Sequence, residues 1–279
     1  MSDDLPVRGA RVRRRGGQRR ASAGFSPRRA VAALILLATA GAIWGVVASP
    51  VFGVRSVTVE GAALTGDAAV RAALDLDGAP TNAFTLATDR LRDRLLALPA
   101  VADAVVSVGL PGTVRVSVTE REPVLAWRRG GALYLVDREG RILGDAHAGS
   151  EAAAAAAAGL PVVADRRDLG PILAVGASVD ALDLDIATRL LSLGPADLGS
   201  SAPGLLVGVD DRDGWTVVPT VEDPWVGVFG FYGPEIRRPD MIPEQVRLLR
   251  SLLVGREPRI LRVVLAGERE GTFTLKTEP

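Results

Sequence analysis

The sequence predicts an α+β protein: a single transmembrane helix, then a small β-α-α-β-β domain, then a mixed β-rich C-terminal domain. This rests on an uncharged apolar run at residues 30–49 and on short alternating hydrophobic strands, with amphipathic helices between them, from residue 54 onward. The chain has no cysteine, so apolar cores rather than disulfide bonds have to stabilise it. The 230 residues after the apolar run are enough for two small domains.

Residues 30–49 are expected to cross a membrane, because twenty residues in a helix span about 30 Å. Residues 1–29 form a basic tail with nine arginines and two aspartates, a formal charge of +7. The positive-inside rule therefore predicts a cytoplasmic tail and an extracytoplasmic C-terminal part, a single-pass type II arrangement in the cell membrane. The whole chain is neutral, so the outer part carries the balancing negative charge, which argues against binding of nucleic acid.

Two other interpretations apply to this end of the chain. A cleaved secretory signal would use Val46-Val47-Ala48 as its cleavage site and Arg28-Arg29 as a twin-arginine pair. Signal peptides have apolar regions of about 7 to 15 residues, so the longer run here favours an uncleaved anchor. The tail could also be a nucleic-acid arm, but Phe25 is its only aromatic residue, which favours a topology signal beside anionic lipid.

The first extracytoplasmic segment is predicted to have the order β-α-α-β-β. Valines in alternation indicate strands near residues 54–60, 101–108 and 114–119. Thr65 and Thr88 are expected to cap the two helices, and Pro99 to end the second one. The periodicity of apolar residues in these strands and helices predicts that three side chains face a shared core: Val57, Leu95 and Val116.

The remaining half is expected to be a β-rich domain with two helices. One helix is expected to be capped by Asp183 and the other to start at Pro243. The low-complexity segment 144–159, with seven consecutive alanines, predicts either a mobile surface loop or a helix formed only on docking. Trp127 is expected either in a core or as an anchor between domains, and strands are expected at 205–209, 215–218, 226–232, 260–265 and 272–276.

The sequence offers no constellation that predicts catalysis, a metal or a cofactor. The only histidine, His147, has no cysteine or second histidine with which to share a metal. Asp210 to Gly214 resembles part of a calcium loop, but the first and twelfth ligands would then be Val209 and Thr220, so a hairpin turn is expected. Gly-x-Ser-x-Gly and phosphate-binding loops are absent from the sequence.

Three blocks carry a resemblance to a known family. Residues 54–61, 95–106 and 111–124 resemble the POTRA domain of the bacterial cell-division proteins FtsQ and DivIB, and residues 126–143 resemble the hairpin that opens the family's β-domain. The resemblance implies a cytoplasmic tail, one span, a POTRA domain at residues 50–121 and a β-domain at residues 122–279.

The same resemblance implies a function. It predicts a membrane-anchored scaffold at the division septum, without enzymatic activity or small-molecule substrate, that binds FtsB and FtsL and helps control septal peptidoglycan synthesis. The alternatives are an anchored or secreted cell-wall enzyme, which would need paired carboxylates in a cleft, and a POTRA-containing transport component, which would need barrel strands.

The partner site is predicted on the last two strands. Segments 260–265 and 272–276 can pair as a terminal hairpin, and an uncovered edge strand is either protected by charge or used for pairing. FtsQ-like proteins are thought to bind FtsB at this sheet, so the resemblance selects six candidates: Thr272, Phe273, Thr274, Leu275, Val263 and Leu265. The alternative is that Phe273 and Leu275 only pack on the core. Replacing Thr274 by proline is expected to remove one backbone donor of this site.

Overall fold

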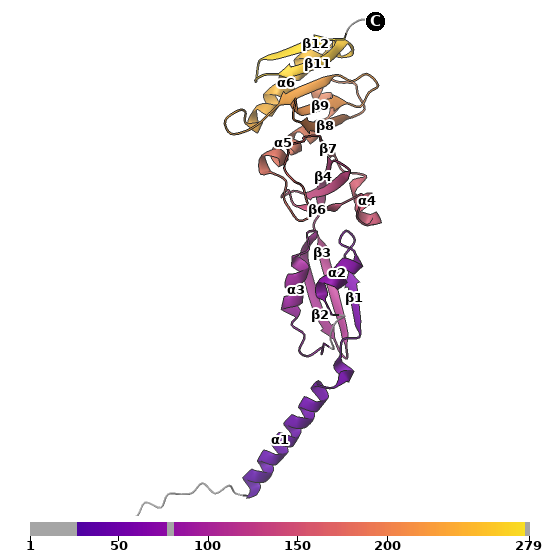
Figure 1. Ribbon diagram of the computed structural model, residues 1–279, viewed down its shortest axis with the longest axis vertical. Helices are drawn as coiled ribbons and strands as arrows, with labels where there is room; N and C mark the ends of the chain where they lie inside the picture. Colours follow the sequence, from indigo (N-terminus) through magenta and orange to yellow (C-terminus); the bar gives the residue numbers. More distant parts are fainter. Residues whose placement is uncertain (1–26, 77–80, 277–279) are drawn as a thin grey trace, which may run out of the picture. The chain divides into compact units, whose positions relative to one another are not determined.

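The computed structural model describes residues 27–76 and 81–276, and the chain divides into two compact units, residues 1–49 and 50–279. The first unit contains helix α1 (Pro27–Val47; Figure 1), and none of the residues of this helix is buried. Among the described residues, α1 is the one helix long and apolar enough to cross a membrane. It begins three residues before the predicted span and includes Arg28 and Arg29. The basic tail before Pro27 lies outside the described residues.

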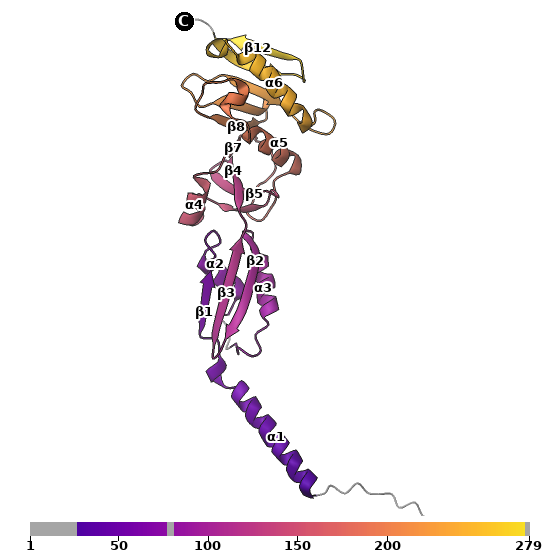
Figure 2. The same ribbon diagram turned by 180° about the vertical axis from the view of Figure 1, so that it is seen from behind.

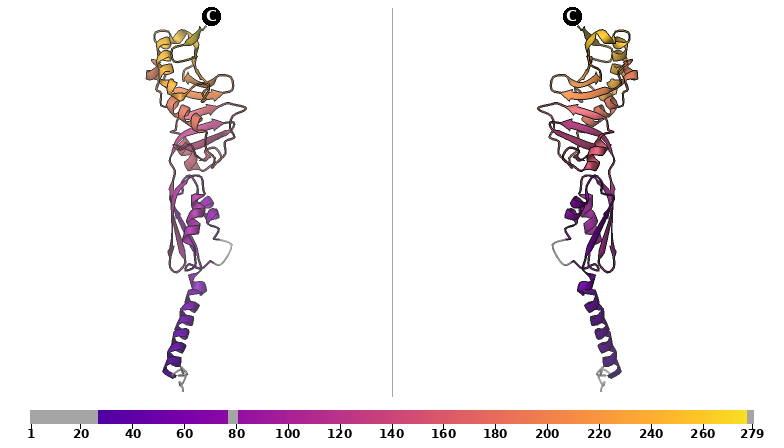
Figure 3. Two further views of the ribbon diagram at one scale, coloured as in Figure 1. Left: turned by 90° about the vertical axis from the view of Figure 1, so that its left-hand side faces the viewer. Right: turned by 90° about the vertical axis from the view of Figure 1, so that its right-hand side faces the viewer.

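The second unit begins with the predicted β-α-α-β-β order. After a 3₁₀ turn, η1 (Pro50–Phe52), the elements are β1 (Ser56–Glu60), α2 (Asp67–Leu74), α3 (Thr88–Leu96), β2 (Val101–Gly109) and β3 (Thr113–Glu120). The sheet order is β1-β3-β2, with β1 parallel and β2 antiparallel to β3. Figure 3 shows α2 and α3 on the same side of this sheet.

The core of this small domain largely matches its prediction. Leu95 and Val116 are 0% and 1% exposed, and Val57 is partly buried against them. The predicted caps are wrong, because Gly66 and Ala87 occupy the two N-cap positions without a side-chain hydrogen bond. Thr65 instead donates its backbone amide to the Glu120 carboxylate, which fixes it in the preceding loop, and Thr88 is already the first helical residue.

A mixed nine-stranded sheet forms the C-terminal domain, in the order β12-β11-β10-β9-β8-β7-β4-β5-β6. Strands β4, β7 and β8 are parallel to one another, β10 is parallel to β11, and the other neighbours are antiparallel. The strands are β4 (Pro123–Arg129), β5 (Ala132–Asp137), β6 (Ile142–Asp145), β7 (Val162–Asp165), β8 (Leu205–Asp210), β9 (Gly214–Pro219), β10 (Val226–Gly230), β11 (Ile260–Leu265) and β12 (Gly271–Leu275).

Two helices cover one side of this sheet, α5 (Ala181–Leu191) and α6 (Ile242–Leu253) (Figure 2). Three 3₁₀ turns accompany them: η2 (Pro195–Leu198), η3 (Pro239–Met241) and η4 (Glu257–Arg259). Trp127 is fully buried in the shared core, as predicted, and packs edge to face on Trp215. The predicted cap of α5 is wrong: Asp180 accepts the amides of Leu182 and Asp183 and is therefore the N-cap residue.

The alanine-rich segment forms helix α4 (Glu151–Ala157). The Ser150 hydroxyl caps it by accepting the amide of Ala153. Ala153 and Ala157 are buried in a small cluster with Ala126. Ala126 and Trp127 are neighbours on one strand, so α4 covers the sheet face opposite α5 and α6. The segment is therefore a docked helix, the second of the two interpretations, because contacts with the sheet stabilise a helix too short to persist alone.

An aspartate followed by a glycine predicts hairpin turns at residues 137–140 and 210–214, and the structure confirms both. The Asp137 carboxylate accepts the amides of Glu139 and Arg141, and Gly140 has a φ of 84°. The Asp210 carboxylate likewise accepts the amides of Arg212 and Asp213 before Gly214, whose φ is 67°. These carboxylates satisfy turn amides, which is a structural role.

Candidate partner-binding surface

Strand β12 forms one edge of the nine-stranded sheet. It is antiparallel to β11, with Val264 opposite Thr272 and Arg262 opposite Thr274. No other strand in the described part of the chain pairs with it. The predicted terminal hairpin is thus present, and β12 is the strand whose outer side is open (Figure 1).

Antiparallel geometry shows which backbone groups of β12 face outward. The hairpin closes with the amide of Ala266 donating to the carbonyl of Glu270 over 2.8 Å. Because hydrogen-bonded pairs alternate along an antiparallel ladder, Thr272 and Thr274 direct their N–H and C=O groups toward β11. The backbone groups of Gly271, Phe273 and Leu275 therefore point to the open edge. The amide of Thr274 belongs to the internal ladder, which corrects the prediction that proline at this position would remove a donor from the open edge.

The candidate side chains fall into two groups. Thr272, Phe273, Thr274 and Leu275 are exposed, Phe273 by 44% and Leu275 by 43%, so part of each of the last two side chains is accessible to a partner. Val263 and Leu265 are 0% exposed, and their strand is paired on both sides with β10 and β12. Their side chains cannot contact a partner, and they contribute to the core behind the edge strand.

The open edge of β12 is held in place, but it lacks the side chains that usually prevent pairing with another strand. The Lys276 ammonium donates to the carbonyl and the carboxylate of Asp223 at 2.8 and 2.7 Å, which fixes the end of the strand. Gly271 lies against Leu248 and Leu252 of α6. The strand itself contains no charged residue and no proline, the usual means of preventing edge pairing.

The aromatic segment near residues 224–239 serves mainly the core. Trp225 and Phe229 are buried, and the Tyr232 hydroxyl donates to Gln245 at 2.6 Å. The Trp225 indole donates to Glu257 at 2.9 Å. Burial raises the pKa of the Glu257 carboxyl, but hydrogen bonds from Ser200, Trp225 and the Ser201 amide outweigh it and hold that pKa below its usual value. Burial raises the pKa of Tyr232.

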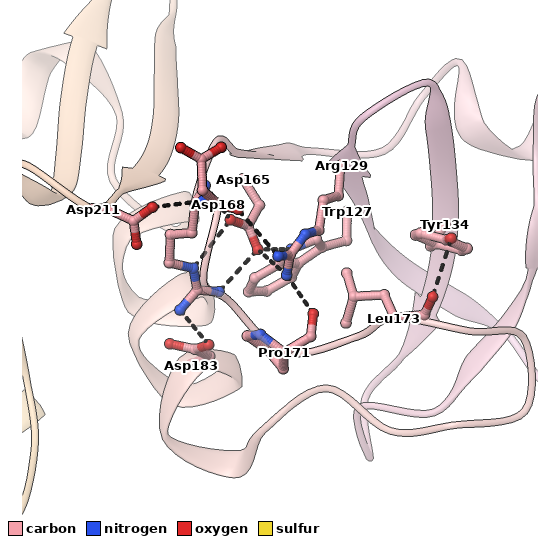
Figure 4. A network of polar contacts seen from close by, with 10 residues as sticks. Trp127, Arg129, Tyr134, Asp165, Asp168, Pro171, Leu173, Asp183 and Asp211 are labelled. Atoms are coloured by element: carbon pink, nitrogen blue, oxygen red, sulfur yellow. Dashed lines mark hydrogen bonds and ion pairs between the residues drawn. The ribbon is translucent and has the colours of Figure 1, made fainter.

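A second polar cluster lies where β4 and β7 end (Figure 4). The Asp165 side chain is 0% exposed, and its carboxylate accepts from Trp127 Nε1 at 3.1 Å and from Arg167 Nη2 at 2.9 Å. Arg129 approaches the same carboxylate at 3.6 Å, and Arg167 also pairs with Asp183 at 2.9 Å. The prediction from sequence missed this cluster because its members come from three elements that only tertiary structure brings together.

Opposite pKa shifts mark the two acids of this cluster. Burial raises the pKa of the Asp165 carboxyl, but hydrogen bonds from the Arg167 side chain and amide and from Trp127 reverse this and hold the pKa below its usual value. At Asp183 burial outweighs the attraction of Arg167, so the pKa is raised. Both carboxylates are bound by arginines, which is typical of a structural ion network.

The described residues contain no group of three or more metal-ligating side chains that could hold a metal ion. His147 Nδ1 lies 2.9 Å from the carbonyl of Gly131, next to the turn between β4 and β5. In the charged block 120–122, Arg121 joins the two domains by pairing with Asp137 at 3.1 Å, whereas the Glu120 carboxylate accepts the amides of Leu64 and Thr65 within the first domain.

Comparisons with known proteins agree with this architecture. Residues 52–121 match the family model of the FtsQ-type POTRA domain. Cell division protein FtsQ of Chloroflexus aggregans is 31% identical over 189 residues, which cover 66% of each chain. FtsQ of Caulobacter vibrioides is 29% identical over 215 residues, 72% of this chain and 66% of that protein. FtsQ of Chloroflexus aurantiacus is 32% identical over 120 residues, 43% of each chain.

The fold and these matches define an α+β protein with an FtsQ-type POTRA domain, similar to bacterial cell division proteins. The chain belongs to the FtsQ/DivIB family. The matched segments cover between 43% and 66% of the lengths of these three relatives.

Proposed function

We propose that this protein is a membrane-anchored, non-enzymatic scaffold of the divisome that binds FtsB-type and FtsL-type proteins and through them helps control septal peptidoglycan synthesis. The observation that carries the proposal is the open edge of β12, which ends a nine-stranded sheet with three consecutive outward-facing positions, Gly271, Phe273 and Leu275. A partner segment in extended conformation would pair with this edge through its backbone, while Phe273 and Leu275 would supply selectivity. Membership of the FtsQ family supports the choice of partners.

The test replaces an outward-facing residue and compares it with an inward-facing one. Phe273→Pro removes an amide donor from the open edge and leaves the ladder with β11 intact, an arrangement that edge strands tolerate. Phe273→Val is the matched control, since it shortens the side chain but keeps the amide. Thr274→Pro removes a ladder donor and is expected to loosen the hairpin itself.

The full-length variants are to be co-expressed with the FtsB and FtsL homologues of the same bacterium and purified from membranes. We expect Phe273→Pro to abolish co-purification at an unchanged melting temperature, and Phe273→Val to retain most of it. Full co-purification of a folded Phe273→Pro protein would place the binding site elsewhere, with the exposed Phe231 as the next position to test.

The orientation in the membrane is part of the same proposal. The +7 tail supports a cytoplasmic N-terminus and an extracytoplasmic ectodomain. A reporter active only in the cytoplasm should function when fused before Ala30 and fail when fused after Pro279. The opposite pattern would contradict both the orientation and any role outside the cytoplasm.

A further inference from the structure

The loop between β7 and α5 presents two large apolar side chains almost entirely to solvent. Leu169 is 93% and Ile172 is 92% exposed, the highest values of any large hydrophobic residue in the described part of the chain, α1 included. Single exposed apolar residues are common on protein surfaces. Two such residues three positions apart on one short loop, with the half-exposed Val175 after them, form a localised apolar surface.

Several contacts hold this loop in one conformation. The Arg129 guanidinium donates to the carbonyls of Pro171 and Arg167, and the Tyr134 hydroxyl donates to the carbonyl of Leu173 at 3.2 Å (Figure 4). The amide of Asp168 donates to the Asp211 carboxylate. The Leu173 side chain is 9% exposed and anchors the loop in the core. A loop fixed in this way loses little conformational entropy when it binds a partner.

Two arginine side chains without a carboxylate partner among the described residues lie beside this loop. A cleft of about 660 Å³ at the ends of β4 and β7 is lined by Arg128, Arg129, Arg166 and Arg167, together with Asp165 and Asp168. Arg129 and Arg167 are paired with Asp165. Arg128 and Arg166 are exposed, and the structure gives neither a carboxylate partner among the residues that it describes. Two guanidinium groups are therefore available within the same cleft.

We propose that Leu169 and Ile172, with Arg128 and Arg166, form a docking surface for a protein partner that offers an apolar pocket next to aspartate or glutamate. Charge complementarity supports this occupant: the two free arginines lie in an extracytoplasmic part that is otherwise negatively charged. An anionic membrane is a less suitable partner, because its broad negative surface would face Asp168 and Asp211 as well as the arginines, whereas a protein can place a single acidic side chain against Arg128 and Arg166.

A second copy of the chain is a less suitable partner on charge grounds. The apolar groove between α5 and α6, formed around Ile242 and Val246, is lined by three arginines, Arg189, Arg247 and Arg250, and by one acidic residue, Asp197, so its excess of positive charge would repel Arg128 and Arg166. The proposed surface also differs from the β12 edge, since β12 and β7 are separated by β11, β10, β9 and β8 in the sheet. It goes beyond the proposed function and can be tested independently of it.

The test places a photo-crosslinking amino acid at position 172 of the full-length protein in the membranes of the bacterium that carries it. We expect one discrete protein adduct, whose crosslinked peptide, identified by mass spectrometry, contains an acidic residue close to apolar residues. In the double variant Arg128→Glu and Arg166→Glu the adduct yield should fall about tenfold, because two attractive contacts become repulsive. Arg138→Glu, which reverses an exposed charge elsewhere, is the control and should leave the yield unchanged.

Several outcomes would overturn the proposal. These are the lack of any adduct, an adduct with lipid, an adduct with a second copy of the chain, or a protein adduct whose yield is insensitive to the double charge reversal at an unchanged melting temperature. Phe273→Pro should not change this adduct, so failure of the β12 proposal and failure of this one give different results.

Discussion

Asp165 shows how a single residue can hold several elements together. Its carboxylate connects the Trp127 indole on β4 with Arg167, and Arg167 in turn reaches Asp183 on α5. The side chain is 0% exposed, so its charge has little access to water and depends on these donors. A buried ion network of this kind is costly to break at one member, because the remaining charges stay in place without compensation.

Replacing Asp165 by asparagine should lower the free energy of unfolding by about 3 kcal/mol at neutral pH, because Arg167 and Arg129 lose their buried counter-charge. Urea unfolding of the wild-type and variant proteins measures this loss. Asp185→Asn, in an exposed pair on α5 with Arg189, is the control and should cost less than about 1 kcal/mol. A similar cost for both variants would contradict the role of Asp165.

The same residue predicts a pH dependence. The pKa of Asp165 in the folded protein lies below its ordinary value of 3.8, so the unfolded chain binds the proton more readily. The stabilisation is therefore fully present above about pH 4 and is lost as the pH falls through the lowered pKa. We expect the difference in unfolding free energy between wild type and Asp165→Asn to shrink on acidification from pH 5 toward pH 2. A constant difference would show that the carboxylate charge does not contribute.

At the scale of elements, the sequence predicted strands and hairpins well, because their signals are local. The alternation of valines in β3 and the Asp137 and Gly140 turn each depend on a few neighbouring residues. The prediction of the helix caps failed where a tertiary contact replaces the local capping hydrogen bond. At Thr65, for example, the backbone amide donates to the Glu120 carboxylate. The parallel pairing of β4 with β7 could not be predicted, since it joins strands separated by two others and a helix. For that reason the Asp165 cluster and the exposed loop were also missed.

The sequence predicted helix α3 correctly, and two substitutions can test which face of this helix packs against the core. Leu95 is 0% exposed in the core of the POTRA domain, so Leu95→Ala should reduce the free energy of unfolding by about 2 to 5 kcal/mol. Arg90→Ala, on the exposed side of the same helix, should change it by less than about 0.5 kcal/mol. Denaturant unfolding of both variants compares the two faces, and equal stability would show that α3 presents a different face to the sheet.

Residues 50–279 act as one compact unit because specific contacts join the POTRA domain to the β-domain. Leu64 packs against the small cluster that contains Ala126 and α4, and the Ser150 hydroxyl donates to the carbonyl of Ala63 at 3.2 Å. The Arg141 guanidinium donates to the carbonyl of Pro99 at 3.2 Å. A scaffold with partners on both domains would benefit from such a junction, since binding at one end then keeps a defined geometry at the other.

Glu120 is the residue through which this junction can be tested. Its carboxylate accepts the amides of Leu64 and Thr65 at 2.7 and 2.6 Å, two charge-assisted hydrogen bonds that hold the 61–66 loop against the end of β3. Glutamine has a single acceptor oxygen and would direct its NH₂ group at one of the two amide donors. In Glu120→Gln, hydrogen exchange at the Leu64 and Thr65 amides should therefore accelerate about tenfold or more, as expected for the loss of a hydrogen bond to a charged group.

The exposed Glu122 is the matched control, and Glu122→Gln should leave both amides as protected as in the wild type. Unchanged protection in Glu120→Gln would mean that apolar packing of Leu64 alone holds the loop, and the junction would then resist charge changes but fail in Leu64→Ala.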